Sequence, residues 1–368
     1  MSGRQLVLID ADTVGRARTG DEAYTINLLR ELPGAAADLA FAASLREPSA
    51  MPEDVPAAVR RIALDVASPY MRIPFALPRL ARREGASLVH LQYFVPPAAR
   101  IPAVVTVHDL SFTRRPELFS RRDRLLLGGL VPGSVRRARR VIAVSEFTRG
   151  DLIDRYRLDP ERVVAIPNGV AARFRPDRDA ASEARTTFSL ERPFVLFVGA
   201  LQPRKNATAL LEAFARLRGH DDVELVLAGG DRGGLADVHE RVRALGLGAR
   251  VRLLGHVSEP ALPGLYSAAE LLAFPSLYEG FGLPALEAMA CGTPVCASSG
   301  TGLGEAVGEA GLTFDPTSPE ELAACIARLL EDAPLRERLR AAGLARAAGF
   351  TWRRSAEATA AVYREALA

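Results

Sequence analysis

The chain has 368 residues, of which 48% are hydrophobic and 25% charged, and its formal net charge is +3. This composition is that of a globular protein, and it excludes a disordered or a collagen-like chain. At about 100–200 residues per domain, the length predicts two or three domains. Three cysteines are too few for a disulfide scaffold and fit a reducing cytosol, and they lack the CxxC spacing of many structural zinc sites. Histidine is also scarce, which argues against a structural zinc site.

The basic residues are unusual, because 46 of the 47 are arginine and Lys205 is the only lysine. Residues 1–170 carry a formal charge of +6, whereas residues 171–368 carry −3. Nine of the arginines lie within residues 114–140. This segment could dock on the anionic head groups of a membrane, or it could form an ordinary solvated surface. The modest net charge predicts no nucleic-acid partner.

The N-terminal residues MSGRQLVLIDAD contain no long apolar core, which predicts that the chain has no signal peptide. No apolar run reaches the roughly 18–20 residues that a membrane-spanning helix needs. We therefore expect a cytoplasmic protein, either soluble or peripheral at the inner face of the membrane.

Short apolar runs alternate with amphipathic stretches along the chain, which is the βαβ pattern of parallel sheets covered by helices. In the first half the pattern predicts a helix at residues 22–32 and strands at 5–9, 41–44, 88–91, 103–107, 141–144 and 163–166. Residues 171–192, rich in Arg, Asp, Ala and Pro, predict a linker that contains one helix. The pattern then restarts, with helices at 208–218 and 235–245 and strands at 194–197, 224–228, 251–254, 271–273 and 294–297.

These elements predict an α/β protein with two facing, doubly wound Rossmann-like domains and an interdomain cleft. The predicted parts are an N-terminal domain (1–170), the linker (171–192), a C-terminal domain (193–350) and a C-terminal helix (351–368) that could pack back on the N-terminal domain. Ligands of such sheets bind outside the carboxyl ends of the strands. A cleft between two of them would take a substrate made of two parts.

The most informative motif is YEGFGLPALEAM at residues 278–289, which follows a predicted strand and opens a helix. Gly280 and Gly282 would let the backbone approach a ligand closely, and the helix start would offer free N–H groups to an anion. Glu287, expected in the first turn, could accept hydroxyl hydrogens from a ribose, and Glu279 could bind hydroxyls of a sugar. This order of groups fits a sugar joined through a diphosphate to a ribose. The alternative is an ordinary glycine-rich turn in which Glu287 only complements the helix dipole.

Two adjacent cations, Arg204 and Lys205, follow the first predicted strand of the second half. Arginine supplies a planar fork and lysine a compact charge, and together they suit a diphosphate. The position of the only lysine in this turn is therefore suggestive. The alternative is a solvated loop with one stray lysine.

Two segments of the first half could also contribute to a site. His108 ends a predicted strand, where it could contact a transferred sugar, or backbone groups could satisfy both of its nitrogens. Gly20 precedes a helix and could offer N–H groups to a phosphate or a sugar. Neither a GxGxxG nor a Walker A motif is present, which counts against dinucleotide and ATP sites.

Taken together, these segments resemble the family 4 retaining glycosyltransferases, which have the GT-B fold. The resemblance covers nearly the whole chain and rests on an E-x7-E spacing from Glu279 to Glu287. It also rests on the segment at 20–24, VHD at 107–109, VSEFT at 144–148, IPNGV at 166–170 and PRKN at 203–206. One departure is Ala200, where many relatives carry an arginine.

The resemblance implies a UDP- or GDP-linked sugar donor, held mainly by the C-terminal domain without a metal or another cofactor. Arg204 and Lys205 would neutralise the diphosphate, Glu279 and Glu287 would bind sugar and ribose hydroxyls, and His108 would reach the donor sugar. Further donor contacts would come from Gly20, Val257, Phe281, Gly282 and Leu283, with the base beside Val257.

The implied activity is the retaining transfer of a mannose- or glucose-type hexose to an acceptor hydroxyl in polysaccharide, glycolipid or glycoconjugate biosynthesis. The acceptor would be a sugar, a lipid-linked molecule or a small molecule, and its site would involve residues 70–83 and 92–100. The alternatives are a sugar-nucleotide epimerase or phosphorylase of the same fold and a non-catalytic two-domain binding protein. A phosphorylase would need a lysine for pyridoxal phosphate, and the only lysine already has a role.

Overall fold

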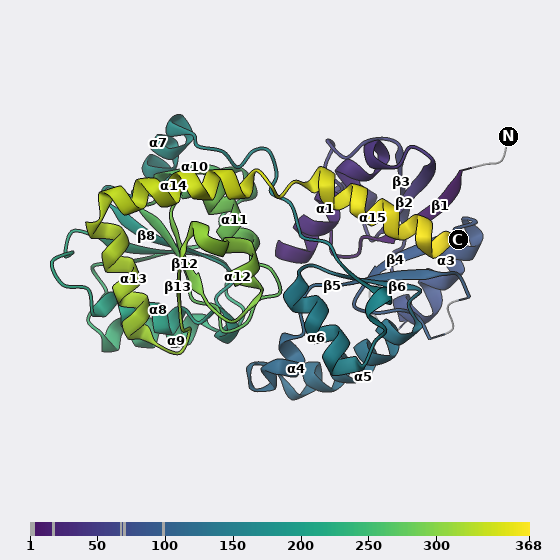
Figure 1. The fold of residues 1–368 in the computed structure, drawn as a ribbon, viewed down its shortest axis with the longest axis horizontal. Coiled ribbons are helices and arrows are strands. Elements are labelled where there is room, and N and C mark those ends of the chain that lie inside the picture. The colour runs from purple at the N-terminus through teal and green to yellow at the C-terminus, as the bar shows by residue number, and fades with distance from the viewer. Residues whose placement is uncertain (1–3, 17–18, 67, 69–70, 98–99) are drawn as a thin grey trace. The chain divides into compact units, whose positions relative to one another are not determined.

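A computed structural model describes residues 4–16, 19–66, 68, 71–97 and 100–368. The chain divides into two compact units. The N-terminal unit comprises residues 1–169 and 351–368, and the C-terminal unit comprises residues 170–350. Each unit is built on its own parallel sheet (Figure 1). This arrangement confirms the prediction of two Rossmann-like α/β domains.

The N-terminal sheet has seven strands in the order β3-β2-β1-β4-β5-β6-β7, and the order reverses between β1 and β4. The edge strand β3 was not predicted, because two adjacent exposed arginines, Arg60 and Arg61, interrupt its apolar pattern. The strands are β1 (Gln5–Asp10), β2 (Leu39–Leu45), β3 (Val59–Ala63), β4 (Leu88–Gln92), β5 (Ala103–Val107), β6 (Arg140–Ala143) and β7 (Val163–Ala165).

Helices cover both faces of this sheet. Right-handed crossovers place the helix after β1 on one face and the helices that precede β4, β6 and β7 on the other. The last helix of the chain packs against the first and also contacts β4, β5 and β6. The helices are α1 (Thr19–Ala35), α3 (Leu77–Arg83), α4 (Ser111–Arg114), α5 (Arg121–Arg137), α6 (Glu146–Tyr156) and α15 (Trp352–Leu367), and the short turns are η1 (Pro48–Ala50), η2 (Arg72–Ala76), η3 (Pro116–Leu118) and η4 (Pro160–Arg162).

The C-terminal sheet has six strands in the order β10-β9-β8-β11-β12-β13, with a reversal between β8 and β11. The prediction missed β13, because three residues are too short for a recognisable pattern. The strands are β8 (Phe194–Val198), β9 (Glu224–Ala228), β10 (Val251–Gly255), β11 (Leu271–Phe274), β12 (Val295–Ser298) and β13 (Leu312–Phe314).

The segment 171–192, predicted as a linker with one helix, contains α7 and belongs to the C-terminal unit. A Cβ atom on Gly264 would lie 2.4 Å from the carbonyl oxygen of Ala180, so this glycine permits close packing of α10 on α7. The helices are α7 (Arg178–Thr187), α8 (Ala207–Ala215), α9 (Leu235–Ala244), α10 (Leu262–Ala268), α11 (Leu283–Ala290), α12 (Gly302–Val307), α13 (Pro319–Glu331) and α14 (Ala333–Ala347), and the short turns are η5 (Pro203–Lys205), η6 (Glu259–Ala261) and η7 (Gly308–Ala310).

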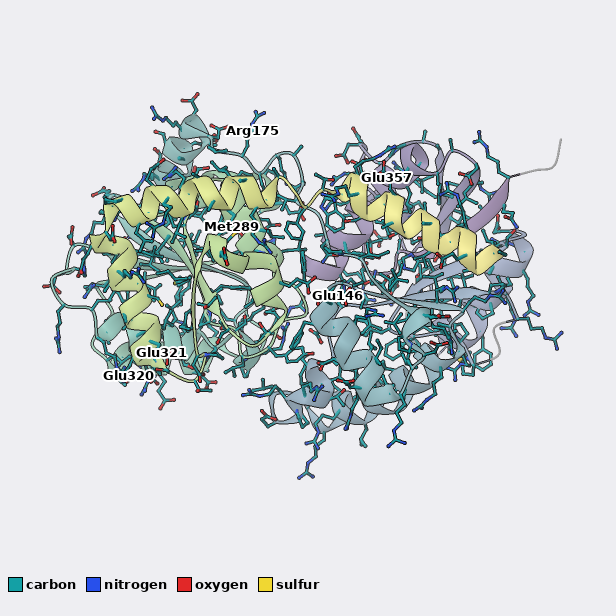
Figure 2. All side chains as sticks on the ribbon, in the orientation of Figure 1. Glu146, Arg175, Met289, Glu320, Glu321 and Glu357 are labelled. Carbon is teal, nitrogen blue, oxygen red and sulfur yellow. The ribbon has the colours of Figure 1, made fainter. Side chains whose placement is uncertain are left out.

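Helix α11, which opens at the glycine-rich motif, is anchored by its apolar face. Met289 is buried and packs on Gly343 of α14, where a Cβ atom would lie 3.2 Å from its Cγ (Figure 2). The ring of Phe281, just before the helix, contacts the ring of Phe350 with centroids 5.9 Å apart. The motif is therefore held by core packing on both sides. No helix in the described part of the chain is long and apolar enough to cross a membrane.

Candidate active site

The candidate site lies at the carboxyl edge of the C-terminal sheet. Parallel sheets bind ligands where the strand order reverses, because the loops diverge there and leave room for a ligand. In this unit the reversal lies between β8 and β11. Arg204 and Lys205 stand on η5 after β8, and Glu279 follows β11. The fold thus places residues from two distant segments at the same point of the sheet.

Three of the residues singled out in the sequence form a compact ion cluster, which we call the Arg204–Lys205–Glu279 cluster. Glu279 Oε1 lies 2.6 Å from Lys205 Nζ and 3.1 Å from Arg204 Nη1. The three side chains are only 10–17% exposed. Lys205 Nζ also lies 4.8 Å from the centre of the Phe274 ring, a cation–π contact. The turn after β8 is therefore an organised charge cluster and not a solvated loop.

The cluster keeps Glu279 ionised. Burial by itself would raise the pKa of Glu279, but the charges of Arg204 and Lys205 outweigh it and lower the pKa to about 2. At neutral pH the cluster therefore carries two positive charges and one negative charge. The remaining positive charge would attract a diphosphate, and Glu279 would hold the two cations in place until the anion arrives.

Backbone contacts fix the two loops that carry the cluster. Asn206 adopts the left-handed conformation, with φ of 55°, and its side-chain amide donates to the carbonyl oxygens of Pro275 and Pro316 at 3.2 and 2.9 Å. Arg204 Nη1 donates to the Tyr278 carbonyl at 2.8 Å, and Leu277 N donates to the Arg204 carbonyl at 2.9 Å. The cations and the carboxylate thus keep one relative position.

The glycine-rich loop before α11 packs closely on the start of α12. Gly282 has a φ of 106°, and a Cβ atom there would lie 2.2 Å from Leu303 Cδ2. Gly302 N donates to the Glu279 carbonyl at 2.9 Å, and a Cβ atom on Gly302 would lie 2.1 Å from the Gly280 carbonyl oxygen. The sequence interpretation assigned Gly280 and Gly282 to ligand approach. The positive φ of Gly282 by itself favours glycine there, and the close contact with the Gly280 carbonyl requires glycine at position 302.

The N–H groups at the start of α11 remain suited to an anion. Among the hydrogen bonds of the described residues, none is donated by the N–H groups of Phe281 or Gly282. Both groups precede Leu283, the first residue of α11, where the helix dipole is positive. They lie in the same loop as Glu279, as the sequence predicted.

Glu287 occupies a different turn of α11 from the one predicted. The helix begins at Leu283, which places Glu287 in its second turn and not in its first. The hydroxyl of Tyr266 donates to Glu287 Oε2 at 2.9 Å. Burial raises the pKa of Glu287 to about 7, although the hydrogen bond from Tyr266 opposes this shift. Near neutral pH this carboxyl group therefore exists in both protonation states.

Val257 lies at the same edge of the sheet but farther from the cluster. It follows β10, is 8% exposed, and stands two strands away from β8. The carbonyl of Gly255 accepts a hydrogen bond from Gly229 N at 2.7 Å, which ties this loop to the end of β9.

In the N-terminal unit, the structure brings His108 close to the segment that contains Gly20. His108 Nε2 lies 2.8 Å from Gln92 Oε1 and 3.9 Å from Asp21 Oδ1, and Gly20 is exposed in the first turn of α1. The alternative in which backbone groups satisfy both nitrogens is therefore wrong for Nε2. The His108 ring also meets the Tyr24 ring edge-on, with centroids 4.8 Å apart.

Sequence reasoning missed an ion cluster at the carboxyl end of β1. Arg72 is 2% exposed and binds Asp10 with both terminal nitrogens, and Asp12 accepts from Arg16 at 2.6 Å and from Arg46 at 2.8 Å. The pair of aspartates directly after a buried strand was a signal that could have been used. Within the loops expected to hold the acceptor, residues 70 and 98–99 lie outside the described residues.

The sequence matches two family profiles. The profile described as "Glycosyltransferase Family 4" covers residues 18–174, and the profile described as "Glycosyl transferases group 1" covers residues 179–346. The chain belongs to glycosyltransferase family 4. This membership favours the transferase over the epimerase, phosphorylase and binding-protein alternatives.

Individual relatives agree with this family. The O-antigen chain mannosyltransferase B of Escherichia coli is 34% identical over 71% of this chain and 70% of its own length. The D-inositol 3-phosphate glycosyltransferase of Salinispora tropica is 40% identical over 73% of this chain but only 60% of its own length. Among solved structures, a sucrose-phosphate synthase from Thermosynechococcus elongatus has a TM-score of 0.79 and 26% identity, with 98% of both chains covered.

Proposed function

We propose that this glycosyltransferase moves a mannose- or glucose-type hexose from a UDP- or GDP-linked donor to an acceptor hydroxyl, with retention of the anomeric configuration and without a metal ion. The observation that carries the proposal is the Arg204–Lys205–Glu279 cluster at the reversal of the C-terminal sheet. The named relatives support hexose transfer in glycoconjugate biosynthesis. The cytoplasmic location stays a prediction from the sequence.

In this proposal each group of the cluster has a separate task. Arg204 and Lys205 neutralise the diphosphate as it leaves, and the N–H groups of Phe281, Gly282 and Leu283 add hydrogen bonds. Glu279 binds hydroxyls of the donor sugar while it positions the two cations. Glu287 accepts the ribose hydroxyls, and Val257 lies beside the base.

The N-terminal unit would contribute His108 to the donor sugar and Gly20 to the phosphate or sugar. His108 Nε2 bonds Gln92, which fixes the orientation of the ring. The acceptor is proposed to be a sugar, a lipid-linked molecule or another small molecule, and the names of two relatives mention an O-antigen chain and D-inositol 3-phosphate.

The transfer itself exchanges one bond for another. The acceptor oxygen forms a bond to the anomeric carbon on the face from which the diphosphate departs, and the bond from that carbon to the phosphate oxygen breaks. The departing phosphate takes the acceptor's proton, so no protein base is needed. Electrostatic stabilisation of this leaving group is the main contribution of the protein.

A panel of UDP-, GDP- and ADP-linked hexoses tests the proposal, with thermal shift to measure binding and release of the nucleoside diphosphate to measure turnover. We expect one donor class to stabilise the protein, turnover to persist in EDTA, and NMR to show a product of retained configuration. A product of inverted configuration would refute the mechanism.

Replacing Lys205 by Ala removes a charge that acts on the leaving group. We expect turnover to fall by about 100- to 1,000-fold, as for the loss of one group that stabilises transition-state charge. Arg243 is exposed on α9, and its replacement by Ala provides a matched control. Turnover of Arg243→Ala should stay within about twofold of the wild-type value. Transfer at the wild-type rate by Lys205→Ala would overturn the role of the cluster.

A further inference from the structure

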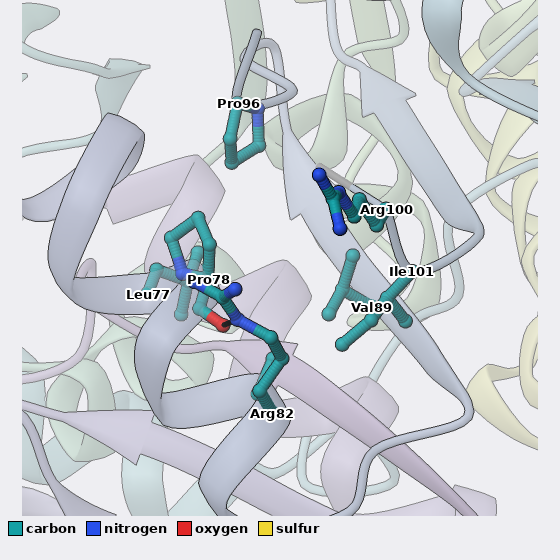
Figure 3. Close-up of a pocket in the computed structure, with 8 residues that line it drawn as sticks. Leu77, Pro78, Arg82, Val89, Pro96, Arg100 and Ile101 are labelled. Carbon is teal, nitrogen blue, oxygen red and sulfur yellow. Dashed lines mark hydrogen bonds between the residues drawn. The ribbon is translucent and has the colours of Figure 1, made fainter. Parts of the chain in front are cut away.

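Polar side chains line one face of the N-terminal sheet at the carboxyl ends of β4 and β5. Successive side chains of a strand point to opposite faces of its sheet. In β4, Val89 and Leu91 belong to the apolar core on the side of α3, and Val89 lines a small apolar pocket beside that helix (Figure 3). The alternation therefore places His90 and Gln92 on the opposite face, where Gln92 contacts Thr25 of α1.

Gln92 and His108 meet on this opposite face. β5 pairs with β4 in the sheet, and His108 directly follows β5. His108 Nε2 lies 2.8 Å from Gln92 Oε1, and the amide nitrogen of Gln92 donates to Thr25 Oγ1 at 2.6 Å. Gln92 therefore connects the histidine to α1.

The hydroxyl hydrogen of Thr25 fixes which way the amide of Gln92 points. Thr25 Oγ1 donates to the backbone carbonyl of Asp21 at 2.8 Å, so it has no second hydrogen to give. It can only accept from Gln92, and it also accepts from Thr13 Oγ1 at 3.1 Å with its other lone pair. Gln92 must therefore present its NH2 group to Thr25 and its carbonyl oxygen to His108.

This orientation of the amide determines where the His108 ring carries its hydrogen. A carbonyl oxygen only accepts, so Nε2, the nitrogen that it faces, must carry a hydrogen. In the neutral ring Nδ1 then has a lone pair and accepts hydrogen bonds. Among the hydrogen bonds between described residues, none involves His108 Nδ1, and the side chain remains 12% exposed. This nitrogen is therefore available to a ligand.

The ionisable groups around the His108 ring agree with this assignment. They are Asp21 and Tyr24 of α1, His90 of β4, Tyr93 after β4 and the neighbouring Asp109. Burial raises the pKa of Tyr24 and lowers the pKa of His90 to about 3, so both side chains are neutral at physiological pH. Asp21 Oδ1 lies 3.9 Å from Nε2, which favours a hydrogen there but is too far to replace the bond to Gln92.

We propose that Gln92 is a positioning residue that holds His108 as the Nε2–H tautomer, so that Nδ1 accepts a hydrogen bond from a hydroxyl of the transferred sugar. This role of Gln92 rests on the proposed function, in which His108 meets the donor sugar. It specifies which atom of the ring binds the sugar. It also specifies the group that the sugar must present, because a lone pair attracts a hydroxyl but repels a group that only accepts, such as a carboxylate.

Nitrogen-15 NMR of the full-length protein with labelled histidine tests the tautomer without any donor. At alkaline pH we expect the wild type to carry the hydrogen on Nε2, and a spectrum of His108→Gln assigns the signals. Thr25→Val removes the group that receives the amide of Gln92, so the amide can rotate and both tautomers should appear. A wild-type ring with its hydrogen on Nδ1, or a Thr25→Val spectrum identical to that of the wild type, would overturn the proposal.

Gln92→Glu tests the contact with the sugar through its pH dependence. The new carboxylate can accept the hydroxyl hydrogen of Thr25, and it favours the doubly protonated ring of His108, which has no lone pair on Nδ1. Relative to the wild type at the same pH, we expect transfer to fall by about five- to tenfold at about pH 7. At about pH 9.5 the ring loses its second proton, and transfer should return to within about twofold of the wild type.

Gln5→Glu provides the matched control, because Gln5 is exposed at the start of β1 and the change of charge is the same. This variant should follow the pH profile of the wild type. A Gln92→Glu variant with that same profile would overturn the role of Nδ1. If no nucleotide sugar supports transfer by the wild type, the proposed function and the contact with the sugar both fail, whereas the NMR spectra still decide whether Gln92 sets the tautomer.

Discussion

The two glutamates of the E-x7-E motif have the same side chain, but their local surroundings shift their pKa values in opposite directions. Glu279 accepts from two cations, which lower its pKa to about 2 against the effect of burial. Glu287 has no cation at such a distance among its described contacts, and burial raises its pKa to about 7. The first carboxyl group is ionised throughout the physiological range, and the second titrates within it.

This difference predicts a pH dependence of donor binding. Glu287 is protonated below its raised pKa, and only the carboxylate can accept both ribose hydroxyls, so affinity should rise with pH up to about 7 and then level off. Below pH 7 the affinity should change by up to about tenfold per pH unit. The substitution Glu287→Gln should abolish this pH dependence and weaken binding. Calorimetric titration with the nucleoside diphosphate between pH 5.5 and about 8.5 measures this.

Glu279→Gln provides the control for this experiment. Because the pKa of Glu279 is about 2, its titration lies outside the range, and the variant should keep the slope of the wild type. A wild-type affinity that does not vary with pH would show that Glu287 does not meet the ribose.

At the scale of elements, the site depends on two helix starts that touch each other. The loop before α11 supplies Glu279, and the first residue of α12, Gly302, lies against the Gly280 carbonyl. This contact leaves no room for a side chain, whereas Gly304, two residues later on α12, has no atom within 4 Å of where its Cβ would be. Packing therefore requires glycine at position 302 of α12, but it does not require glycine at position 304.

The comparison of Gly302→Ala with Gly304→Ala tests this contact. Gly302→Ala should lower the free energy of unfolding by about 1–3 kcal/mol, because the new methyl group pushes the loop aside. It should also weaken donor binding, since the loop carries Glu279. Gly304→Ala should be neutral or stabilising by about 0.5–1 kcal/mol from helix propensity alone. Urea unfolding and donor titration give both quantities, and equal effects of the two substitutions would contradict the packing argument.

At the scale of the whole molecule, the last helix of the chain completes the unit that contains the first strand. Tyr363 of α15 lies with its hydroxyl 2.6 Å from His90 Nδ1, and His90 Nε2 lies 2.8 Å from Thr106 Oγ1. Tyr24 of α1 reaches the same threonine at 2.9 Å. Burial lowers the pKa of His90 to about 3, so the ring is neutral at physiological pH. This buried network joins α1, β4, β5 and α15.

Removing the Tyr363 hydroxyl should therefore destabilise the N-terminal unit. Tyr363→Phe leaves His90 Nδ1 buried without that partner, which should cost about 1–3 kcal/mol of unfolding free energy. Tyr156→Phe is the control, because the hydroxyl of Tyr156 makes only a weak contact, 3.4 Å from Thr113 Oγ1. This substitution should lower the free energy of unfolding by less than about 1 kcal/mol. Thermal unfolding of the two variants compares them, and a Tyr363 variant as stable as the wild type would show that the network does not hold α15.

Several residues of the candidate site were singled out from the sequence, and the reasons differ from residue to residue. Arg204, Lys205 and Glu279 were found because each follows a buried strand in a motif of unusual composition. Glu287 was predicted in the first turn of α11 but lies in the second. The prediction was wrong because the start of the helix depends on the left-handed conformation of Gly282. The pairing of Arg72 with Asp10 was not predicted, since one arginine among 46 carries no signal of its own.

By itself, the sequence determined the parallel α/β architecture, most central strands and the glycosyltransferase family, because apolar runs and motif spacings are local properties of the chain. Only the tertiary structure decided that Arg204 and Lys205 share one carboxylate and that α15 belongs to the N-terminal unit. These features depend on distances between segments far apart in the chain. Packing and burial set those distances, and with them the pKa values that separate Glu279 from Glu287.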